Sequence, residues 1–129
     1  MAKNYTFNAN ISCTATSSTG YSQSQSGTFT LNLTGIDQVE TGRKNITTGG
    51  VDIMAGPDFG KVVYVRNLDD TNFVTVSMVS DADNTIAVLE PGEFCFTILR
   101  DNGVIHGRAD TATVTVEYFA VEIDSNARG

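Results

Sequence analysis

Between Lys61 and Asp124 the chain reads KVVYVRNLDDTNFVTVSMVSDADNTIAVLEPGEFCFTILRDNGVIHGRADTATVTVEYFAVEID. Short apolar or alternating runs follow one another in this stretch, and Asn, Asp, Gly and Pro stand between them. Runs of this kind, separated by turn-forming residues, predict consecutive β-strands. This half of the chain decides the fold class, and we expect an all-β protein.

The last run of this stretch has the clearest alternation. Its apolar positions are Ala112, Val114, Val116, Tyr118 and Ala120, which alternate with Thr113, Thr115 and Glu117. A period of two predicts a strand with one face toward the core. We expect this strand to be the longest in the protein and to lie in the middle of its sheet.

Two turns in the same half have a sequence explanation. Pro91 presets φ for the second position of a turn and Gly92 accepts positive φ at the third, which predicts a type II turn over 90–93. The segment 67–72 reads NLDDTN, and its Asp and Asn side chains can hydrogen bond to their own backbone. We therefore expect a turn between two strands there.

The first half of the chain is less regular. Every second position from 5 to 15 holds one of the residues Tyr5, Phe7, Ala9, Ile11, Cys13 and Ala15. This period predicts a strand over 5–16, and a similar pattern predicts a second strand over 27–34, antiparallel to the first. Between these strands lies a polar segment that includes Tyr21, Ser22, Gln23, Ser24 and Gln25. It is interpreted either as a flexible loop or as an exposed strand.

No segment combines helical spacing of apolar residues with a capping signal. Short strands are expected at 43–48 and 51–54, where glycines are too frequent for a helix. The predicted fold is a single antiparallel β-sandwich domain over 1–129. A jelly roll is the first choice. An immunoglobulin-like sandwich is second, because the spacing of the two cysteines and the absence of Trp fit it poorly.

Composition excludes some partners. The formal net charge is −7 and the sequence pI is about 4.4, whereas binding to a phosphate backbone requires clustered Lys and Arg. The N-terminus has no apolar run of signal-peptide type, and no stretch is long and apolar enough for a membrane helix. We expect no nucleic-acid or membrane partner, and synthesis in a reducing cytoplasm. Cys13 and Cys95 are expected to be packed free thiols, with a disulfide between two strands as the alternative.

Catalytic and metal-binding patterns are weak. His106 is the only histidine, and a triad would need a nucleophile activated by that one base. The segments 69–70 and 81–84 are rich in carboxylates, which calcium prefers, but neither has a twelve-residue loop with a closing Glu. They are interpreted as solvated turns. We expect no catalytic residue, no metal and no cofactor, and hence no enzyme.

Four segments together resemble a pattern that recurs in small structural proteins of tailed bacteriophages. They are YVRNLD at 64–69, TNFV at 71–74, LEPGE at 89–93 and TVTVEY at 113–118, with Ala109 between the last two. The resemblance implies a single jelly-roll domain that decorates or cements a capsid, often as a homotrimer. It also implies the major capsid protein of the same virion as partner, and a location on the capsid surface after synthesis in the host cytoplasm.

The same resemblance implies roles for particular residues. Asn67 would close one strand through its side chain, and the turn at Pro91 and Gly92 would fix the register of the next strand. Asp69 and Asn72 belong to the same structural turns. Candidate contact regions for a capsid are the polar segment with Tyr21, Ser22, Gln23, Ser24 and Gln25 and the loops around Gly49 and Gly56, because loops displayed by a rigid sandwich often bind partners. The alternative function is a phage tail or fibre module that binds carbohydrate or a receptor, since such proteins use similar domains.

Overall fold

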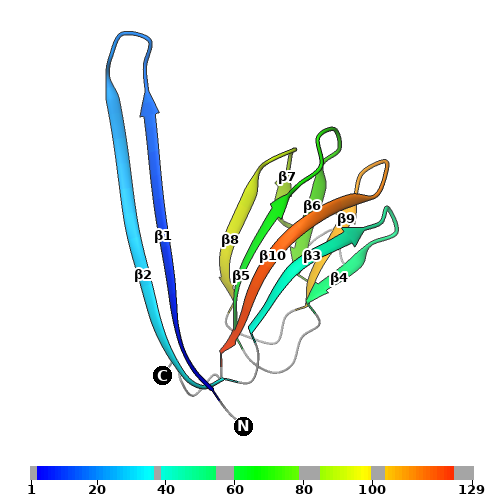
Figure 1. The fold of residues 1–129 in the computed structure, drawn as a ribbon. Helices are drawn as coiled ribbons and strands as arrows, with labels where there is room; N and C mark the ends of the chain where they lie inside the picture. Colours follow the sequence, from blue (N-terminus) through cyan, green and yellow to red (C-terminus); the bar gives the residue numbers. More distant parts are fainter. Residues whose placement is uncertain (1–2, 37–38, 55–59, 79–84, 100–103, 124–129) are drawn as a thin grey trace. The chain divides into compact units, whose positions relative to one another are not determined.

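The structure, a computed structural model, describes residues 3–36, 39–54, 60–78, 85–99 and 104–123. These residues form ten β-strands (Figure 1), which confirms the all-β prediction. The chain divides into two compact units, Met1–Ile36 and Asp37–Gly129. The sequence interpretation treated 1–129 as one sandwich. In the structure the sandwich belongs to the second unit, and the first unit is a two-stranded hairpin.

The first unit consists of β1, Lys3–Thr16, and β2, Ser22–Ile36, which pair antiparallel. The antiparallel pairing was predicted, but both strands extend beyond the predicted ranges. The segment 22–25 is an exposed strand, as in the second of the two interpretations, and not a flexible loop. With 15 residues, β2 is longer than the 10-residue strand that ends the sandwich. The prediction that this last strand is the longest was wrong.

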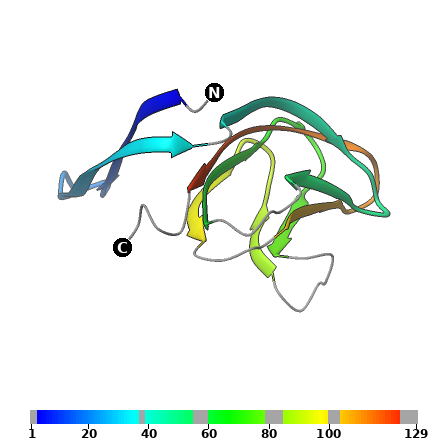
Figure 2. The same cartoon turned by 90° about the horizontal axis from the view of Figure 1, so that it is seen from below.

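The second unit contains two four-stranded antiparallel sheets that face each other (Figure 2). Its strands are β3 Val39–Ile46, β4 Val51–Met54, β5 Gly60–Asn67, β6 Val74–Met78, β7 Thr85–Leu89, β8 Phe94–Leu99, β9 Ile105–Ala109 and β10 Val114–Ile123. One sheet has the order β3-β10-β5-β8 and the other has the order β4-β9-β6-β7. As predicted, β10 lies inside its sheet, between β3 and β5.

Strand pairing in this unit is nested. The first strand pairs with the last, β4 pairs with β9, β5 with β8, and β6 with β7. The unit is thus one long hairpin that is folded over, and the additional pairs β10–β5 and β9–β6 close it into two sheets. Eight strands in this order form a jelly roll, the first choice from sequence. The immunoglobulin-like alternative would have sheets of four and three strands with another order.

The core lies between the two sheets and is built from aliphatic side chains. Its buried members are Ile46, Ile53, Val63, Val65, Val74, Val76, Leu89, Ile105, Ala109, Val114, Val116 and Ala120. Alternation along β10 places Val114, Val116 and Ala120 in this core, whereas Thr115 and Glu117 face away from it. Burial of so many branched side chains supplies the main driving force for folding of the sandwich.

Candidate functional site

The end of the hairpin is a compact five-residue turn between Thr16 and Ser22. The backbone N–H of Ser17 donates to the carbonyl of Tyr21 at 2.7 Å, and the N–H of Tyr21 donates to Ser17 Oγ at 3.0 Å. Gly20 has φ +94°, a conformation that glycine adopts without strain. This turn leaves the Tyr21 side chain 80% exposed. A large aromatic side chain held at the end of a hydrogen-bonded turn is well suited to contact a partner.

The other predicted contact residues lie next to this turn on β2. Ser22, Gln23, Ser24 and Gln25 pair with Thr16, Ala15, Thr14 and Cys13 respectively, and all four are exposed. The structure therefore brings the five predicted contact residues to one end of the hairpin. We call the segment 17–25 the hairpin tip.

The hairpin has two chemically different faces. One face carries alternating polar pairs, and Thr28 and Thr30 donate hydrogen bonds to Asn10 and Asn8 across the strands at 3.1 and 3.0 Å. The opposite face carries Phe7, Ala9, Ile11, Cys13 and Ala15 on β1, and Phe29 on β2. Phe7 and Phe29 make an edge-to-face ring contact with centroids 6.3 Å apart. We call this second surface the apolar face of the hairpin.

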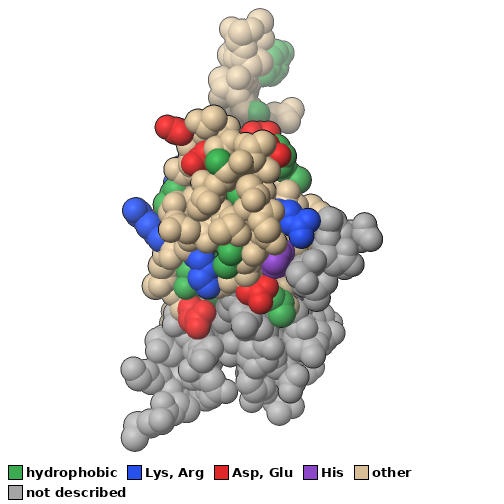
Figure 3. All heavy atoms as spheres, turned by 90° about the vertical axis from the view of Figure 1, so that its right-hand side faces the viewer, with side chains coloured by type: hydrophobic (Ala, Val, Ile, Leu, Met, Phe, Trp, Pro, Cys, Tyr) green, Lys and Arg blue, Asp and Glu red, His purple; other side chains and the backbone are tan. Residues whose placement is uncertain are grey.

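Charge is distributed unequally between the two units. Lys3 is the only charged residue before Asp37. Residues 37–129 therefore hold seven of the eight basic residues and all fifteen acidic residues, a formal net charge of −8. Figure 3 shows red and blue side chains over the visible face of the sandwich, and none on the visible end of the hairpin. From Asn4 to Ile36 the hairpin therefore carries no charged side chain.

Asn67 is the centre of the turns at one end of the sandwich. It is fully buried, and its Nδ2 donates to the carbonyls of Asn72 and Leu89, both at 2.9 Å. Its Oδ1 accepts the N–H of Asp69 at 2.8 Å. Both N–H groups of the side-chain amide and its oxygen are thus hydrogen-bonded to backbone. These contacts join the 67–72 turn to the end of β7.

Asp69 and Asn72 organise the rest of this turn. Asp69 Oδ2 accepts the backbone N–H of Asn72 at 2.6 Å and that of Thr71 at 3.0 Å. These hydrogen bonds, with that of Asn72 the strongest, hold the pKa of Asp69 below its usual value. Asn72 Oδ1 in turn accepts a hydrogen bond from Thr111 at 2.9 Å. The 67–72 turn is thus fixed by local hydrogen bonds and by a contact to the loop before β10.

The turn at Pro91 and Gly92 is attached to Asn67 through the backbone. The N–H of Glu93 donates to the carbonyl of Glu90 at 3.0 Å, and Gly92 has φ +83°, as in a type II turn. The N–H of Gly92 donates to the carbonyl of Asn67, and the N–H of Asn67 donates to that of Glu93. Asn67, Asp69, Asn72 and Gly92 therefore meet in one hydrogen-bonded cluster, and Pro91 precedes Gly92 in its turn.

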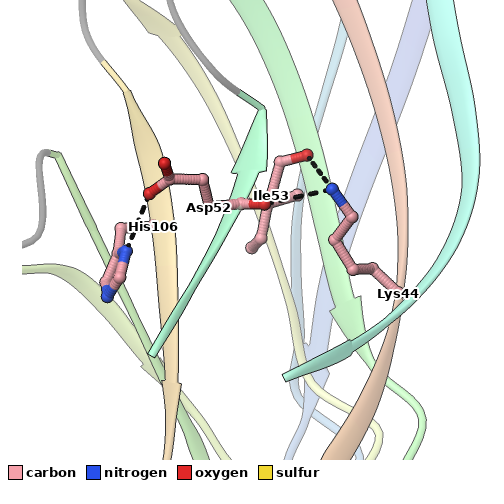
Figure 4. Close-up of polar contacts among 4 residues, drawn as sticks. All are labelled: Lys44, Asp52, Ile53 and His106. Atoms are coloured by element: carbon pink, nitrogen blue, oxygen red, sulfur yellow. Dashed lines mark hydrogen bonds and ion pairs between the residues drawn. The ribbon is translucent and has the colours of Figure 1, made fainter. Parts of the chain in front are cut away.

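His106 lies within β9 and is buried, with Nδ1 3.0 Å from Asp52 Oδ1 on β4 (Figure 4). Its Nε2 is buried without a hydrogen-bond partner among the described residues. A Cβ added at Gly50 would lie 2.3 Å from this nitrogen, so backbone occupies the space in front of it. The histidine is paired on one side and closed off on the other, which leaves no room for a substrate at Nε2.

Lys44 stabilises β4 from the neighbouring sheet. Its Nζ donates to the carbonyls of Asp52 and Ile53 at 3.0 and 3.2 Å (Figure 4). The described residues contain no group of three or more His, Cys, Asp or Glu side chains that could hold a metal ion. The carboxylate-rich segment 69–70 lies in the hydrogen-bonded turn described above. The segment 81–84 lies outside the described residues.

Both cysteines are free thiols, as predicted. Cys95 faces the core from β8, and burial raises its pKa. Cys13 is exposed on the apolar face of the hairpin, so the expectation that both thiols are packed was wrong for this residue. The alternation around Cys13 does define one face of β1, but within the described part of the first unit, a two-stranded sheet, no further layer covers that face.

The outer face of the sheet β3-β10-β5-β8 carries aromatic side chains. Phe94 is 55% exposed, and its ring lies 5.7 Å from that of Tyr64, measured between centroids. The hydroxyl of Tyr64 donates to Glu117 Oε2 at 2.9 Å. Burial and this hydrogen bond raise the pKa of Tyr64. Phe94, Phe96 and Ile98 alternate along β8 with Cys95, which packs against the core, so their common face points away from the core.

Comparison of the chain with protein-family models, with curated proteins and with solved structures gives no match. Within the part of the chain that the structure describes, no helix has the length and apolar character needed to cross a membrane.

Proposed function

We propose that this chain is a virion structural protein, a decoration protein that binds the outer surface of a capsid and stabilises the shell. The observation that carries the proposal is the combination of a self-contained jelly roll with a long hairpin that has no charged residue after Lys3. The resemblance of 64–118 to phage structural proteins supplies the capsid as partner. On this proposal the protein is made in the host cytoplasm and acts without a cofactor.

The hairpin tip is the proposed capsid contact. At about 3.3 Å per residue, the 14 residues of β1 extend over roughly 46 Å. The tip combines an aromatic side chain, Tyr21, with Ser and Gln side chains that both donate and accept hydrogen bonds. Aromatic residues contribute strongly to binding when a partner surface covers them. Repetition of this contact over many copies would turn weak individual binding into stable attachment.

Capsids assembled without this protein test the proposal. We expect the purified chain to co-sediment with them to saturation and to raise the temperature at which they release their contents. Tyr21→Ala should weaken binding, because it removes the largest exposed side chain of the tip. Ser18→Ala changes another residue of the same turn and is the matched control. If the unmodified chain does not bind such capsids, the proposal is wrong.

A second candidate function is a tail or fibre module that binds carbohydrate. It is favoured by the aromatic pair of Tyr64 and Phe94 on the outer sheet face, beside the carboxylate of Glu117. Aromatic rings with nearby hydrogen-bonding groups are a common arrangement in ligand sites. Specific binding on a glycan array that is lost in Phe94→Ala, with capsid binding absent, would favour this candidate over the first.

A further inference from the structure

We propose that the outer face of the sheet β3-β10-β5-β8 binds an acidic oligosaccharide, with Phe94 beneath one sugar ring and Arg66 on the carboxylate of that sugar. The inference deepens the second candidate function, on which it rests for carbohydrate as the class of ligand. It does not involve the hairpin, because every residue that carries it belongs to the sandwich.

The four strands of this sheet lie side by side (Figure 1), and one row of side chains crosses them. Glu117 on β10 is the direct partner of Arg43 on β3 and of Arg66 on β5. Arg66 is in turn the direct partner of Phe94 on β8. Direct partners have their side chains on the same face of a sheet, and Cys95, the neighbour of Phe94, packs against the core. The row therefore lies on the outer face, and we call Arg43, Glu117, Arg66 and Phe94 the outer row.

The charge of the outer row suits an anionic ligand. The row holds two guanidinium groups and one carboxylate, although the unit as a whole is acidic. Among the described residues, no carboxylate forms an ion pair with Arg43 or Arg66. The Glu117 carboxylate accepts instead from the Tyr64 hydroxyl, through Oε2 at 2.9 Å. Both arginines are exposed, and a guanidinium binds a carboxylate through two parallel hydrogen bonds.

The turns at this end of the sandwich hold Arg66 in position. Its Nε donates to the carbonyl of Gly92 at 3.2 Å, and the next residue, Asn67, is fully buried. Burial and the hydrogen bond to Glu117 raise the pKa of Tyr64, whereas the charge of Arg66 lowers it, so the guanidinium lies near this hydroxyl. Because the contact to Gly92 uses Nε, the terminal nitrogens can bind a ligand. A side chain that is already positioned loses less conformational entropy on binding.

Phe94 supplies the apolar part of the site. Its ring is 55% exposed and lies 5.7 Å from that of Tyr64, measured between centroids. A pyranose ring can pack its C–H groups against such a ring while its hydroxyl groups bond to neighbouring polar side chains. Glu117 provides an acceptor for these hydroxyl groups and Arg66 provides donors. A carboxylate without hydroxyl groups would meet Glu117 only as a like charge, which disfavours an acidic peptide as the ligand.

The spacing of the two arginines indicates a ligand of more than one sugar. Arg43 and Arg66 belong to strands that are separated by β10, so their backbones are about 10 Å apart. Glu117 lies between them in the outer row. We therefore expect Arg66 to bind the carboxylate of the sugar on Phe94, and Arg43 to bind the carboxylate of a further sugar along the chain.

Binding of oligosaccharides to the purified chain, measured by calorimetry, tests the inference. The probes are tetramers of galacturonic acid and of glucuronic acid, each compared with its methyl ester, which keeps the sugar rings and removes the charge. We expect at least one acid tetramer to bind about tenfold or more tightly than its ester, because hydrogen bonds between charged groups are lost in the ester. The corresponding single sugar acid should bind more weakly, since it reaches only Arg66.

Substitutions within the outer row assign the contacts. Arg66→Gln should weaken binding of the acid tetramer about tenfold and leave binding of the ester nearly unchanged. Arg43→Gln should weaken binding of the tetramer but not that of the single sugar acid. Arg108→Gln is the matched control, because Arg108 is an exposed arginine on β9 in the other sheet, and it should leave binding unchanged. Urea unfolding of each variant checks that the sandwich is intact.

The outcomes separate this inference from the functions proposed above. Equal binding of the acids and their esters, or binding that is insensitive to Arg66→Gln, would overturn the inference and leave carbohydrate binding in place. Absence of binding to every oligosaccharide would overturn both. Binding to capsids, measured on the same preparations, tests the first proposal independently of these results.

Discussion

The side-chain amide of Asn67 donates to the carbonyl of Leu89 at 2.9 Å, although the two residues are separated by 22 positions in the chain. This contact joins the end of β5 to the end of β7, and thereby one sheet to the other. Asn67 is 0% exposed, so this hydrogen bond satisfies a polar side chain that is buried inside the sandwich.

We expect Asn67→Ala to destabilise the sandwich by about 3 kcal/mol, because it leaves buried backbone groups without partners. Urea unfolding followed by circular dichroism measures the change. Asn45→Ala is the matched control, since Asn45 makes an exposed hydrogen bond to Thr115, and it should cost less than about 0.5 kcal/mol. Equal effects of the two substitutions would contradict the role assigned to Asn67.

Gly50 and Gly92 allow steric crowding to be separated from backbone strain. Both have positive φ, +95° and +83°, but a Cβ would lie 2.3 Å from His106 Nε2 at Gly50 and would meet nothing within 4 Å at Gly92. We expect Gly92→Ala to cost about 1 kcal/mol from strain alone. Gly50→Ala should cost about 3 to 4 kcal/mol, because crowding adds to the strain.

The double variant Gly50→Ala with His106→Ala tests this explanation by removing the crowded ring. Part of the loss in the free energy of unfolding should be recovered relative to the sum of the two single variants. Additive single effects would show that the contact with His106 is not the cause.

Stability should fall in acid partly through Asp69. The hydrogen bonds from Asn72 and Thr71 lower its pKa in the folded state below the ordinary value of 3.8. Its contribution is therefore complete above pH 3.8 and is lost as the pH falls through the folded value. A carboxyl ¹³C titration should place the Asp69 midpoint below 3.8, and Asp69→Asn should make unfolding less dependent on pH in this range. A midpoint at or above 3.8 would refute the prediction.

Cys95 should react slowly in the folded protein. Burial raises its pKa, so less thiolate is present at pH 8, and the thiolate is the reactive form. In a Cys13→Ser background, the remaining thiol should react with a disulfide reagent much more slowly in buffer than in urea. Comparable rates in the two solvents would show that the core around β8 opens readily.

The sandwich could be predicted from sequence because its local signals agree with its tertiary structure. The alternation from Val114 to Ala120 gave the inward face of β10, and Pro91 with Gly92 gave a turn with the observed φ. The nested order of strands could not be predicted in this way, because it depends on pairings between segments that are distant in the sequence. The contact of His106 with Asp52 follows from such a pairing, which is why no local pattern indicated it.

The hairpin was harder to predict in its details. Ser22 to Gln25 have neither apolar alternation nor strong strand preference, so the sequence left a flexible loop open as an alternative. Their strand structure results from pairing with Thr16 to Cys13, which the turn at Gly20 places opposite them. The outward orientation of Phe94 was likewise hidden, because alternation shows which residues share a face but not which face is buried.

Nested pairing has a consequence for the order in which the chain can fold during synthesis. The strands of the hairpin are neighbours in sequence and can pair as soon as both have left the ribosome. By contrast, the partner of β3 within its sheet is β10, so β3 waits until the last strand of the jelly roll has been made. The polar end and the apolar face of the hairpin thus exist on the nascent chain before the sandwich can close.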